Sequence, residues 1–157
     1  MKVELTINGR KKEIEASAGA TLLDVLRGEG YLGVKSGCGS GDCGACAVLM
    51  DGRAGNSCLT LAAKANGSSV ITVEGLADGA SLHPLQQAFL DTGAVQCGYC
   101  TPGMLMSALD LLSRNPEPSD AEIREAISGN LCRCTGYVKQ VEAIRSGAEA
   151  MRSERHD

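Results

Sequence analysis

The sequence predicts an α+β protein made of two small domains, in which a strand-rich N-terminal half precedes a helical C-terminal half. In residues 1–76 apolar residues alternate with polar ones between turn signals, whereas in residues 77–157 they recur at helical spacing. The stretch Gly75–Ser81, rich in Gly, Ala and Asp, has the composition of a linker. We therefore expect one domain over residues 1–76 and a second over residues 77–157.

Strand patterns dominate the first half. One pair covers Val3–Ile7 and a partner reaching Ile14, joined by the turn Asn8-Gly9. A second pair covers Ala47–Met50 and a partner that delivers Cys58, joined by the turn Asp51-Gly52, and Val70–Glu74 is a further strand. Asn-Gly and Asp-Gly pairs favour two-residue hairpin turns. Thr21 and Asp24 resemble a helix-capping pair, and the apolar residues that follow predict a short helix ending near Gly28. The order strand, strand, helix indicates a β-grasp domain.

The second half contains four helix patterns. Pro84 suits the first turn of one helix, and Pro102 opens the next. Asn115-Pro116 stops that second helix, and Ser119 caps a third. The apolar faces comprise Leu85, Ala88, Phe89 and Val95; Met104, Leu105, Ala108, Leu109 and Leu112; Ile123, Ala126 and Ile127; and a run from about Val138 to Met151. We expect an all-α four-helix bundle.

The eight cysteines fall into two groups of four, and the first group has a diagnostic spacing, Cys38-x4-Cys43-x2-Cys46-x11-Cys58. This is the spacing of a plant-type [2Fe–2S] ferredoxin loop. Glycines lie among these ligands and allow backbone N–H groups to point at the sulfurs; they are Gly37, Gly39, Gly41 and Gly44. A zinc site with four cysteine ligands is the alternative, although zinc modules pair their ligands in two short knuckles.

The second group, Cys97-x2-Cys100 with Cys132-x-Cys134, uses every remaining cysteine. By spacing alone it could hold zinc, an iron–sulfur cluster or a redox disulfide. Cys100 precedes Pro102, and Cys134 precedes the helix expected beyond residue 136, so both lie near helix N-termini that favour thiolates and a buried anion. We expect two helical hairpins that close on one cluster.

Composition excludes several other classes of function. Lys and Arg total 15 against 19 Asp and Glu, which leaves a net charge of −4, no basic stripe and almost no aromatic residues for stacking, so nucleic acid is not an expected partner. Met1–Gly19 lacks an apolar signal region, and no apolar run reaches membrane-spanning length. We expect a cytoplasmic protein without membrane insertion. His83 and His156 are lone histidines and read as surface or capping residues.

Three stretches, GCGSGDCGAC (37–46), QCGYCTPGM (96–104) and GNLCRCTGY (129–137), resemble the iron–sulfur small subunit of the molybdenum hydroxylase family, which includes xanthine dehydrogenase, aldehyde oxidoreductase and nicotinate dehydrogenase-like enzymes. The resemblance implies that the β-grasp domain carries one [2Fe–2S] cluster and the helical domain a second. It also implies a large partner subunit with a molybdopterin cofactor and a medium partner subunit with FAD. Electrons would pass from molybdenum through the helical-domain cluster and the ferredoxin-like cluster to the flavin.

The same resemblance assigns individual residues. All eight cysteines would be cluster ligands, Gln96 would hydrogen-bond the pterin of the large subunit, and Cys134 would also lie against that pterin. No catalytic residue is expected, because the substrate would bind elsewhere; an N-heteroaromatic ring, a purine or an aldehyde is implied, with a lean toward the first. Arg133 between two ligands could bond near the cluster or form an ion pair at an interface. A free-standing, diffusible two-cluster ferredoxin is the alternative.

Overall fold

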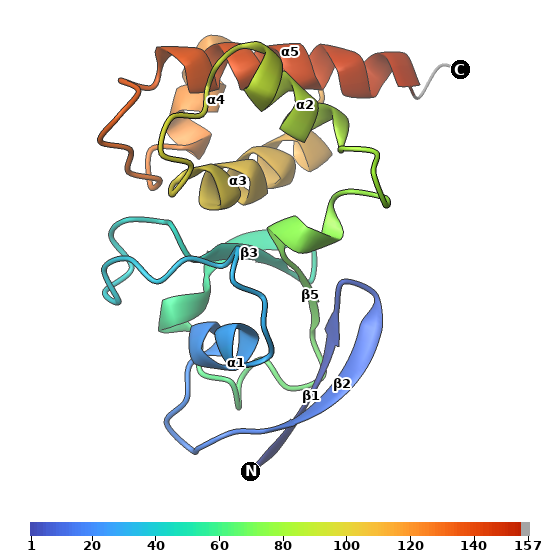
Figure 1. Ribbon diagram of the computed structural model, residues 1–157, viewed down its shortest axis with the longest axis vertical. Coiled ribbons are helices and arrows are strands. Elements are labelled where there is room, and N and C mark those ends of the chain that lie inside the picture. The colour runs from blue at the N-terminus through green and yellow to red at the C-terminus, as the bar shows by residue number, and fades with distance from the viewer. Residues whose placement is uncertain (155–157) are drawn as a thin grey trace.

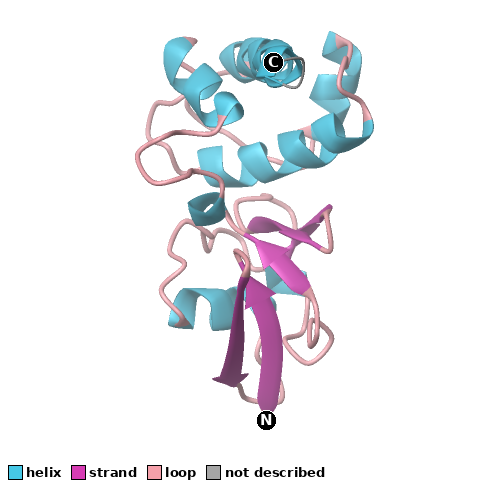
Figure 2. Cartoon of the chain, turned by 90° about the vertical axis from the view of Figure 1, so that its right-hand side faces the viewer, coloured by secondary structure: helices cyan, strands magenta, loops and turns pink. Residues whose placement is uncertain are grey.

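The computed structural model describes residues 1–154, so His156 lies outside the described residues. The sheet and one short helix occupy the N-terminal end of the molecule, and the remaining helices occupy the other end (Figure 1). Figure 2 shows the same separation, with strands confined to one half. Within residues 1–154 no helix is both long and apolar enough to cross a membrane.

The N-terminal half contains a five-stranded sheet with the order β2-β1-β5-β3-β4. Its strands are β1 (Lys2–Ile7), β2 (Arg10–Glu15), β3 (Ala47–Met50), β4 (Arg53–Asn56) and β5 (Ser69–Ile71). The pair β1 and β5 is parallel, and the other neighbours are antiparallel. Both predicted hairpins are confirmed, and each turn holds two consecutive residues at positive φ, as a two-residue turn of this kind requires.

Two strand ends differ from the prediction. The last strand stops at Ile71 instead of Glu74, because the chain turns into a 3₁₀ helix at Val73–Gly75. Glu74 stabilises that turn by accepting hydrogen bonds from the backbone N–H of Gly33 and the hydroxyl of Thr72, both at 2.6 Å. Cys58 likewise lies in a 3₁₀ helix after β4, Ser57–Leu59, rather than on the strand itself.

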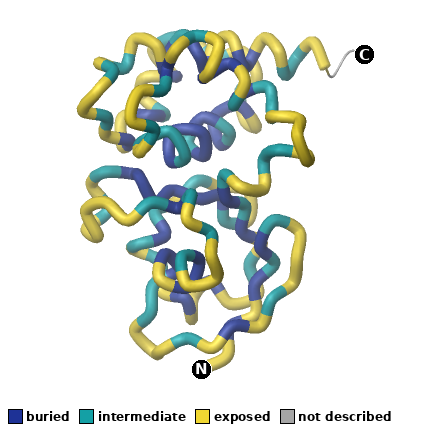
Figure 3. The backbone as a smooth tube through the Cα atoms, in the orientation of Figure 1, coloured by how far each residue is buried: buried dark blue, intermediate teal, exposed yellow. Residues whose placement is uncertain are grey.

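Helix α1 (Leu22–Gly28) begins and ends as predicted. Thr21 and Asp24 form a complete capping box, in which each side chain accepts a hydrogen bond from the other residue's backbone N–H. The buried residues of α1 pack with alternate residues of β1, such as Val3 and Leu5, in one core. Figure 3 shows this core as buried segments between exposed loops.

The C-terminal half contains α2 (Pro84–Asp91), α3 (Thr101–Arg114), α4 (Asp120–Ala126) and α5 (Val138–Glu154). Four helices are therefore confirmed, but α2 ends at Asp91, so Val95 lies beyond it and not on its apolar face. His83 caps α2 and Ser119 caps α4, each within a capping box. Phe89, Met104, Ile123 and Ile144 are among the fully buried side chains that hold the four helices together.

The two halves are in direct contact, with α3 lying over β3 (Figure 1). Ala47 and Leu49 of β3 belong to the same apolar core as the helices. At the edge of this contact the carboxylate of Asp110 on α3 is nearly buried and pairs with Arg53 of β4 at 3.0 Å and with Arg114 at 3.3 Å. The helical half therefore has a fixed orientation on the sheet.

Candidate metal centres

The first four cysteines come together on one loop and the adjoining 3₁₀ helix. Their thiols form two close pairs, because Cys38 and Cys43 exchange N–H···S hydrogen bonds of 3.4 Å and Cys58 is in hydrogen-bonding contact with Cys46. Two hydrogen bonds hold the pairs beside each other, because the side-chain amide of Asn56 donates to the carbonyl oxygen of Gly41 at 3.0 Å and the backbone N–H of Ser57 donates to that of Cys46 at 3.4 Å. Four thiols in two adjacent pairs suit a binuclear centre, in which each iron takes two protein thiolates.

Backbone amides surround the sulfurs of this loop. The N–H groups of Ser40 and Cys43 both donate to the Sγ of Cys38 at 3.4 Å. Hydrogen bonds from Ser40, together with the backbone N–H of Cys43, lower the pKa of the Cys38 thiol to about 6, whereas burial raises the pKa of Cys58 to about 11. The exposed rim of the site thus already favours a thiolate, and the interior needs a cation to do so.

The glycines of this loop serve different purposes. A Cβ at Gly37 would lie 2.6 Å from the Sγ of Cys43, so that glycine leaves room for a ligand sulfur. Gly39 and Gly41 adopt positive φ values of 70° and 85°, which other residues rarely adopt. Gly44 is different, because a side chain there would meet the carbonyl oxygen of Gly129 in the helical half. The sequence predicts that Gly44 belongs to the cluster loop, and the structure shows that Gly44 also lies against Gly129 of the helical half.

The second four cysteines also form two pairs. The Sγ atoms of Cys97 and Cys134 lie 3.6 Å apart, and the thiols of Cys100 and Cys132 are in hydrogen-bonding contact. Cys97 and Cys100 are three residues apart on one segment, and Cys132 and Cys134 are two apart on the other, so these pairs are neighbours as well. Two segments separated by more than thirty residues of sequence therefore meet. One joins α2 to α3 and the other joins α4 to α5, as expected for two helical hairpins.

The argument from helix N-termini holds only in part. Cys100 is the N-cap of α3, but Cys134 precedes the start of α5 at Val138 by four residues. Burial, with the neighbouring Cys132 thiol, raises the pKa of Cys100 to about 12, so the partial charge of the helix end is outweighed. A thiolate at Cys100 therefore requires a positive ion beside it.

Both cysteine sets fit a [2Fe–2S] cluster, since each offers four thiols in two pairs. At the first set, backbone amides also donate to the sulfur of Cys38, and Gly37 leaves room for the sulfur of Cys43. Within residues 1–154 no three His, Cys, Asp or Glu side chains converge as ligands of one metal ion. A binuclear cluster does not need such a group, because each iron is bound by only two cysteines of the chain.

Two functional residues near Cys132 escaped the sequence reasoning. The hydroxyl oxygen of Thr135 lies 3.0 Å from the Sγ of Cys132, and the fully buried amide of Gln140 contacts both Thr135 and Cys132. Burial acts to raise the pKa of Cys132, but hydrogen bonds from Thr135 and from the backbone of Cys134 outweigh burial, so the pKa is lowered overall. A polar residue amid the apolar face of the last helix was the available signal for Gln140.

The two sites are joined by main-chain contacts. The backbone N–H of Leu131 donates to the carbonyl oxygen of Cys43 at 2.9 Å, and the side-chain amide of Asn130 donates to that of Gly44 at 3.1 Å. A Cβ at Gly103 of α3 would clash with the same Gly44 oxygen. We call this set, Gly44, Gly103, Asn130 and Leu131, the Gly44 contact. Leu131 precedes Cys132, so the contact links residues next to both sites.

Comparison with known proteins identifies these sites. Residues 5–77 match a family described as "2Fe-2S iron-sulfur cluster binding domain", and residues 72–145 match "[2Fe-2S] binding domain". The chain is 54% identical to the nicotine 6-hydroxylase small subunit of Paenarthrobacter nicotinovorans over 92% of this chain and 87% of the relative. It is 49% identical to the nicotinate dehydrogenase small FeS subunit of Eubacterium barkeri over 94% of both chains.

A solved structure agrees. The crystal structure of quinoline 2-oxidoreductase from Pseudomonas putida 86 contains a chain with 47% identity and a TM-score of 0.94, covering 98% of this chain and 96% of that one. The chain belongs to the iron–sulfur subunits of the molybdenum hydroxylases. It is an electron-transfer subunit of an oxidoreductase, with two [2Fe–2S] clusters and no substrate site of its own. The alternative of a free-standing ferredoxin is not supported, since the relatives are subunits of larger enzymes.

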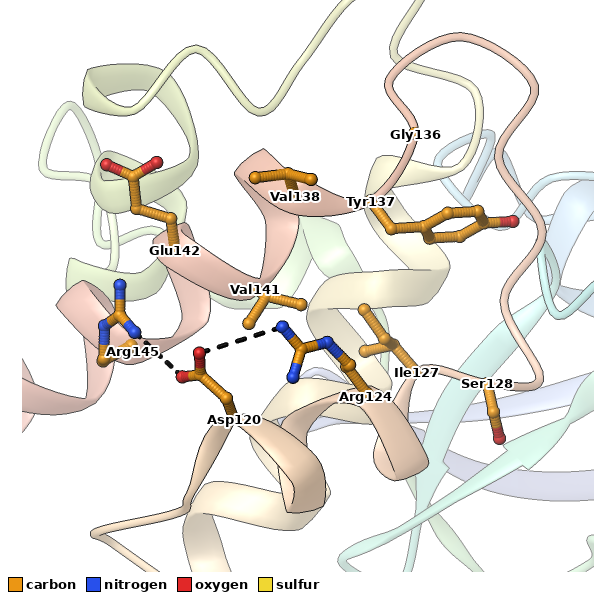
Figure 4. Close-up of a pocket in the computed structure, with 10 residues that line it drawn as sticks. All are labelled: Asp120, Arg124, Ile127, Ser128, Gly136, Tyr137, Val138, Val141, Glu142 and Arg145. Carbon is orange, nitrogen blue, oxygen red and sulfur yellow. Dashed lines mark hydrogen bonds and ion pairs between the residues drawn. The ribbon is translucent and has the colours of Figure 1, made fainter.

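One pocket on this iron–sulfur subunit lies away from the thiols. It is a pocket of about 430 Å³ between α4 and α5, with Ile127 and Val141 among its lining residues (Figure 4). Its two arginines, Arg124 and Arg145, both pair with Asp120, at 3.9 and 2.9 Å. No cysteine lines this pocket, and Glu142 of its lining pairs with Lys139 outside it, at 2.9 Å.

Gln96 and Arg133 lie on the surface near the second site. Both are exposed, and so are the neighbouring ligand candidates Cys97 and Cys134. Within residues 1–154 neither Gln96 nor Arg133 forms a side-chain hydrogen bond or ion pair. Their side chains are therefore available to another subunit.

Proposed function

We propose that this iron–sulfur subunit connects a molybdopterin centre in a large subunit with FAD in a medium subunit. Its first site is formed by Cys38, Cys43, Cys46 and Cys58, and its second by Cys97, Cys100, Cys132 and Cys134. The observation that carries the proposal is the pairing of thiols at both sites, of which the 3.6 Å separation of the Cys97 and Cys134 sulfurs is the clearest case. When bound, the clusters supply one-electron carriers.

The chain's own residues support an arrangement of the two sites in series. The exposed thiols of Cys97 and Cys134, beside Gln96, give the second site a face open to the large subunit. We propose that Gln96 hydrogen-bonds the pterin there and that Cys134 lies against it. The Gly44 contact connects the second site to the first, and we propose that the exposed Cys38 and the loop around it meet the FAD subunit.

The domain assignment follows the same division. We propose a β-grasp domain over residues 1–76 and a four-helix bundle over residues 77–157. The mixed sheet with α1 against it supports the first, and the shared core of α2 to α5 supports the second. We further propose that the assembled enzyme is cytoplasmic, in keeping with the sequence analysis.

The substrate of the complex is proposed to be an N-heteroaromatic ring. The support is the names of similar proteins, a nicotine hydroxylase, a nicotinate dehydrogenase and a quinoline oxidoreductase, whose substrates contain a ring nitrogen. Xanthine dehydrogenase and aldehyde oxidoreductase subunits are also relatives, at 48% and 41% identity, so purines and aldehydes are the competing classes.

The test is purification of the native complex by a tag on this chain. We expect two co-purifying subunits, with about four iron atoms and four acid-labile sulfides per copy of this chain, because four thiolates support one binuclear cluster. Adding nicotinate or quinoline under anaerobic conditions should bleach the cluster and flavin absorbance. Stoichiometric zinc, or a chain that purifies alone with full iron, would contradict the proposal.

A further inference from the structure

The amide of Gln140 is an unusual feature of the second site. Gln140 lies on the first turn of α5, is fully buried, and stands among apolar residues such as Val141 and Ile144. Its nitrogen Nε2 lies 3.2 Å from the carbonyl oxygen of Ala94, 2.5 Å from the Thr135 hydroxyl oxygen, and 3.9 Å from the sulfur of Cys132. Its oxygen Oε1 is buried without a hydrogen-bond partner among residues 1–154.

These neighbours determine how the amide is oriented. The Ala94 carbonyl can only accept a hydrogen bond, so the atom of Gln140 that faces it must be the nitrogen. One amide hydrogen is then used on Ala94 and the other points at Thr135. Oε1 has no hydrogen-bond partner in this orientation. The side chain is therefore held by the hydrogen bonds of Nε2 to Ala94 and Thr135, and one of them is directed at the Thr135 hydroxyl.

The orientation of Gln140 fixes the direction of the next hydrogen bond. The Thr135 oxygen accepts from Gln140 at 2.5 Å and is also approached by the backbone N–H of Tyr137 at 3.4 Å. A hydroxyl has two lone pairs and one hydrogen, so its remaining hydrogen is the group that faces the Cys132 sulfur at 3.0 Å. A ligating thiolate carries no hydrogen and can only accept. Thr135 is therefore the donor in this pair.

We propose that Gln140 and Thr135 form a hydrogen-bond relay that holds one donor on the Cys132 sulfur and raises the reduction potential of the second site. The inference rests on the proposed function, since it requires Cys132 to be a cluster ligand. Hydrogen bonds to ligand sulfurs stabilise the more negative, reduced state of a cluster. Gln140 lies 3.9 Å from the Cys132 sulfur, and its two amide hydrogens are used on Ala94 and Thr135, so it acts as a positioning residue.

The relay is tested in the assembled complex by potentiometric titration followed by electron paramagnetic resonance, with the first cluster as an internal reference. Thr135→Val keeps the side-chain shape and removes the donor, and Thr135→Ser keeps the donor. We expect Thr135→Val to disfavour reduction of the second cluster by about tenfold, which is about 59 mV for a one-electron couple. Thr135→Ser is expected to restore the wild-type potential.

Gln140→Leu tests the relay from its other end. It is expected to shift the second cluster in the same direction by a smaller amount, and the double variant Gln140→Leu, Thr135→Val should match Thr135→Val alone, because both act through one hydrogen bond. Additive shifts would overturn the relay, and so would a Thr135→Val complex with both clusters present and an unchanged potential. A wild-type complex with only one cluster would instead refute the proposed function, so the two failures are distinguishable by iron content.

Discussion

Replacing Gly103 with alanine is expected to destabilise this subunit, although the same change inside a helix is ordinarily favourable. Gly103 lies in the first turn of α3, where propensity alone favours alanine by at most about 1 kcal/mol. A Cβ atom at this position would lie well inside 3.0 Å of the Gly44 carbonyl oxygen, a separation that real Cβ atoms do not adopt. The obstacle is main chain, so it cannot rotate away.

The size of the effect follows from the contacts that must move. Overpacking of this kind costs about 2 kcal/mol. Opening the Gly44 contact also weakens the hydrogen bonds from Asn130 to Gly44 at 3.1 Å and from Leu131 to Cys43 at 2.9 Å, each contributing about 1 kcal/mol net. After the gain in helix propensity is subtracted, about 3 kcal/mol remains, which corresponds to a fall of about 6–12 °C in the unfolding midpoint for a chain of this size.

The assay is thermal unfolding of the assembled, cluster-loaded complex, followed by the visible circular dichroism of the clusters at a fixed heating rate. Gly129→Ala is the matched control, because Gly129 borders the same contact and an added Cβ there meets nothing within 4 Å. The control is expected to unfold within about 2 °C of the wild type. A Gly103→Ala midpoint equal to or above that of the wild type, at equal iron content, would refute the argument that the two halves are held this closely.

Three further predictions concern the cluster sites. Cys43→Ser replaces a soft ligand with a hard one, so the assembled variant is expected to lose the first cluster and the rapid reduction of flavin by substrate; normal flavin reduction without that cluster would show that the order of carriers is wrong. On reduction, the two clusters are expected to give distinct paramagnetic signals, because one lies in a glycine loop and the other between helix ends, and two identical spectra would count against this. Gln96→Ala is expected to keep both clusters but to slow reduction of the second by substrate, with a loss of about 1–3 kcal/mol of interfacial bonding; stopped-flow rates and subunit ratios equal to those of the wild type would return Gln96 to an ordinary surface residue.

Local signals in the sequence were sufficient for most of the elements. The hairpin turns, the capping box at Thr21, and the starts of α2, α3 and α4 are all written within a few neighbouring residues, and each is confirmed. One error occurred where a distant residue decides the structure. The last strand ends early because Glu74 binds the backbone of Gly33, which is forty-one positions away.

The same distinction explains what was missed at the sites. Cysteine spacing predicts which thiols belong together, but it does not predict that burial would raise the pKa of Cys100 at the start of a helix. Gln140 occupies a buried position in a helix whose other buried residues there are mainly apolar, and only the fold places it against Thr135. Gly44 could be assigned to the cluster loop from its neighbours, whereas its approach to Gly129 depends on how the halves pack.

The Gly44 contact makes the two cluster sites structurally interdependent. Leu131, which precedes Cys132 of the second site, donates a hydrogen bond of 2.9 Å to the carbonyl oxygen of Cys43, a proposed ligand of the first site. A displacement of either loop must therefore lengthen this bond or move the other loop. Because metal binding is coupled to folding at thiolate sites, loading one site is expected to order the main chain that carries the other. We therefore expect electron transfer between the sites to depend on a contact that contains no metal ligand side chain, only glycine, asparagine and main-chain groups.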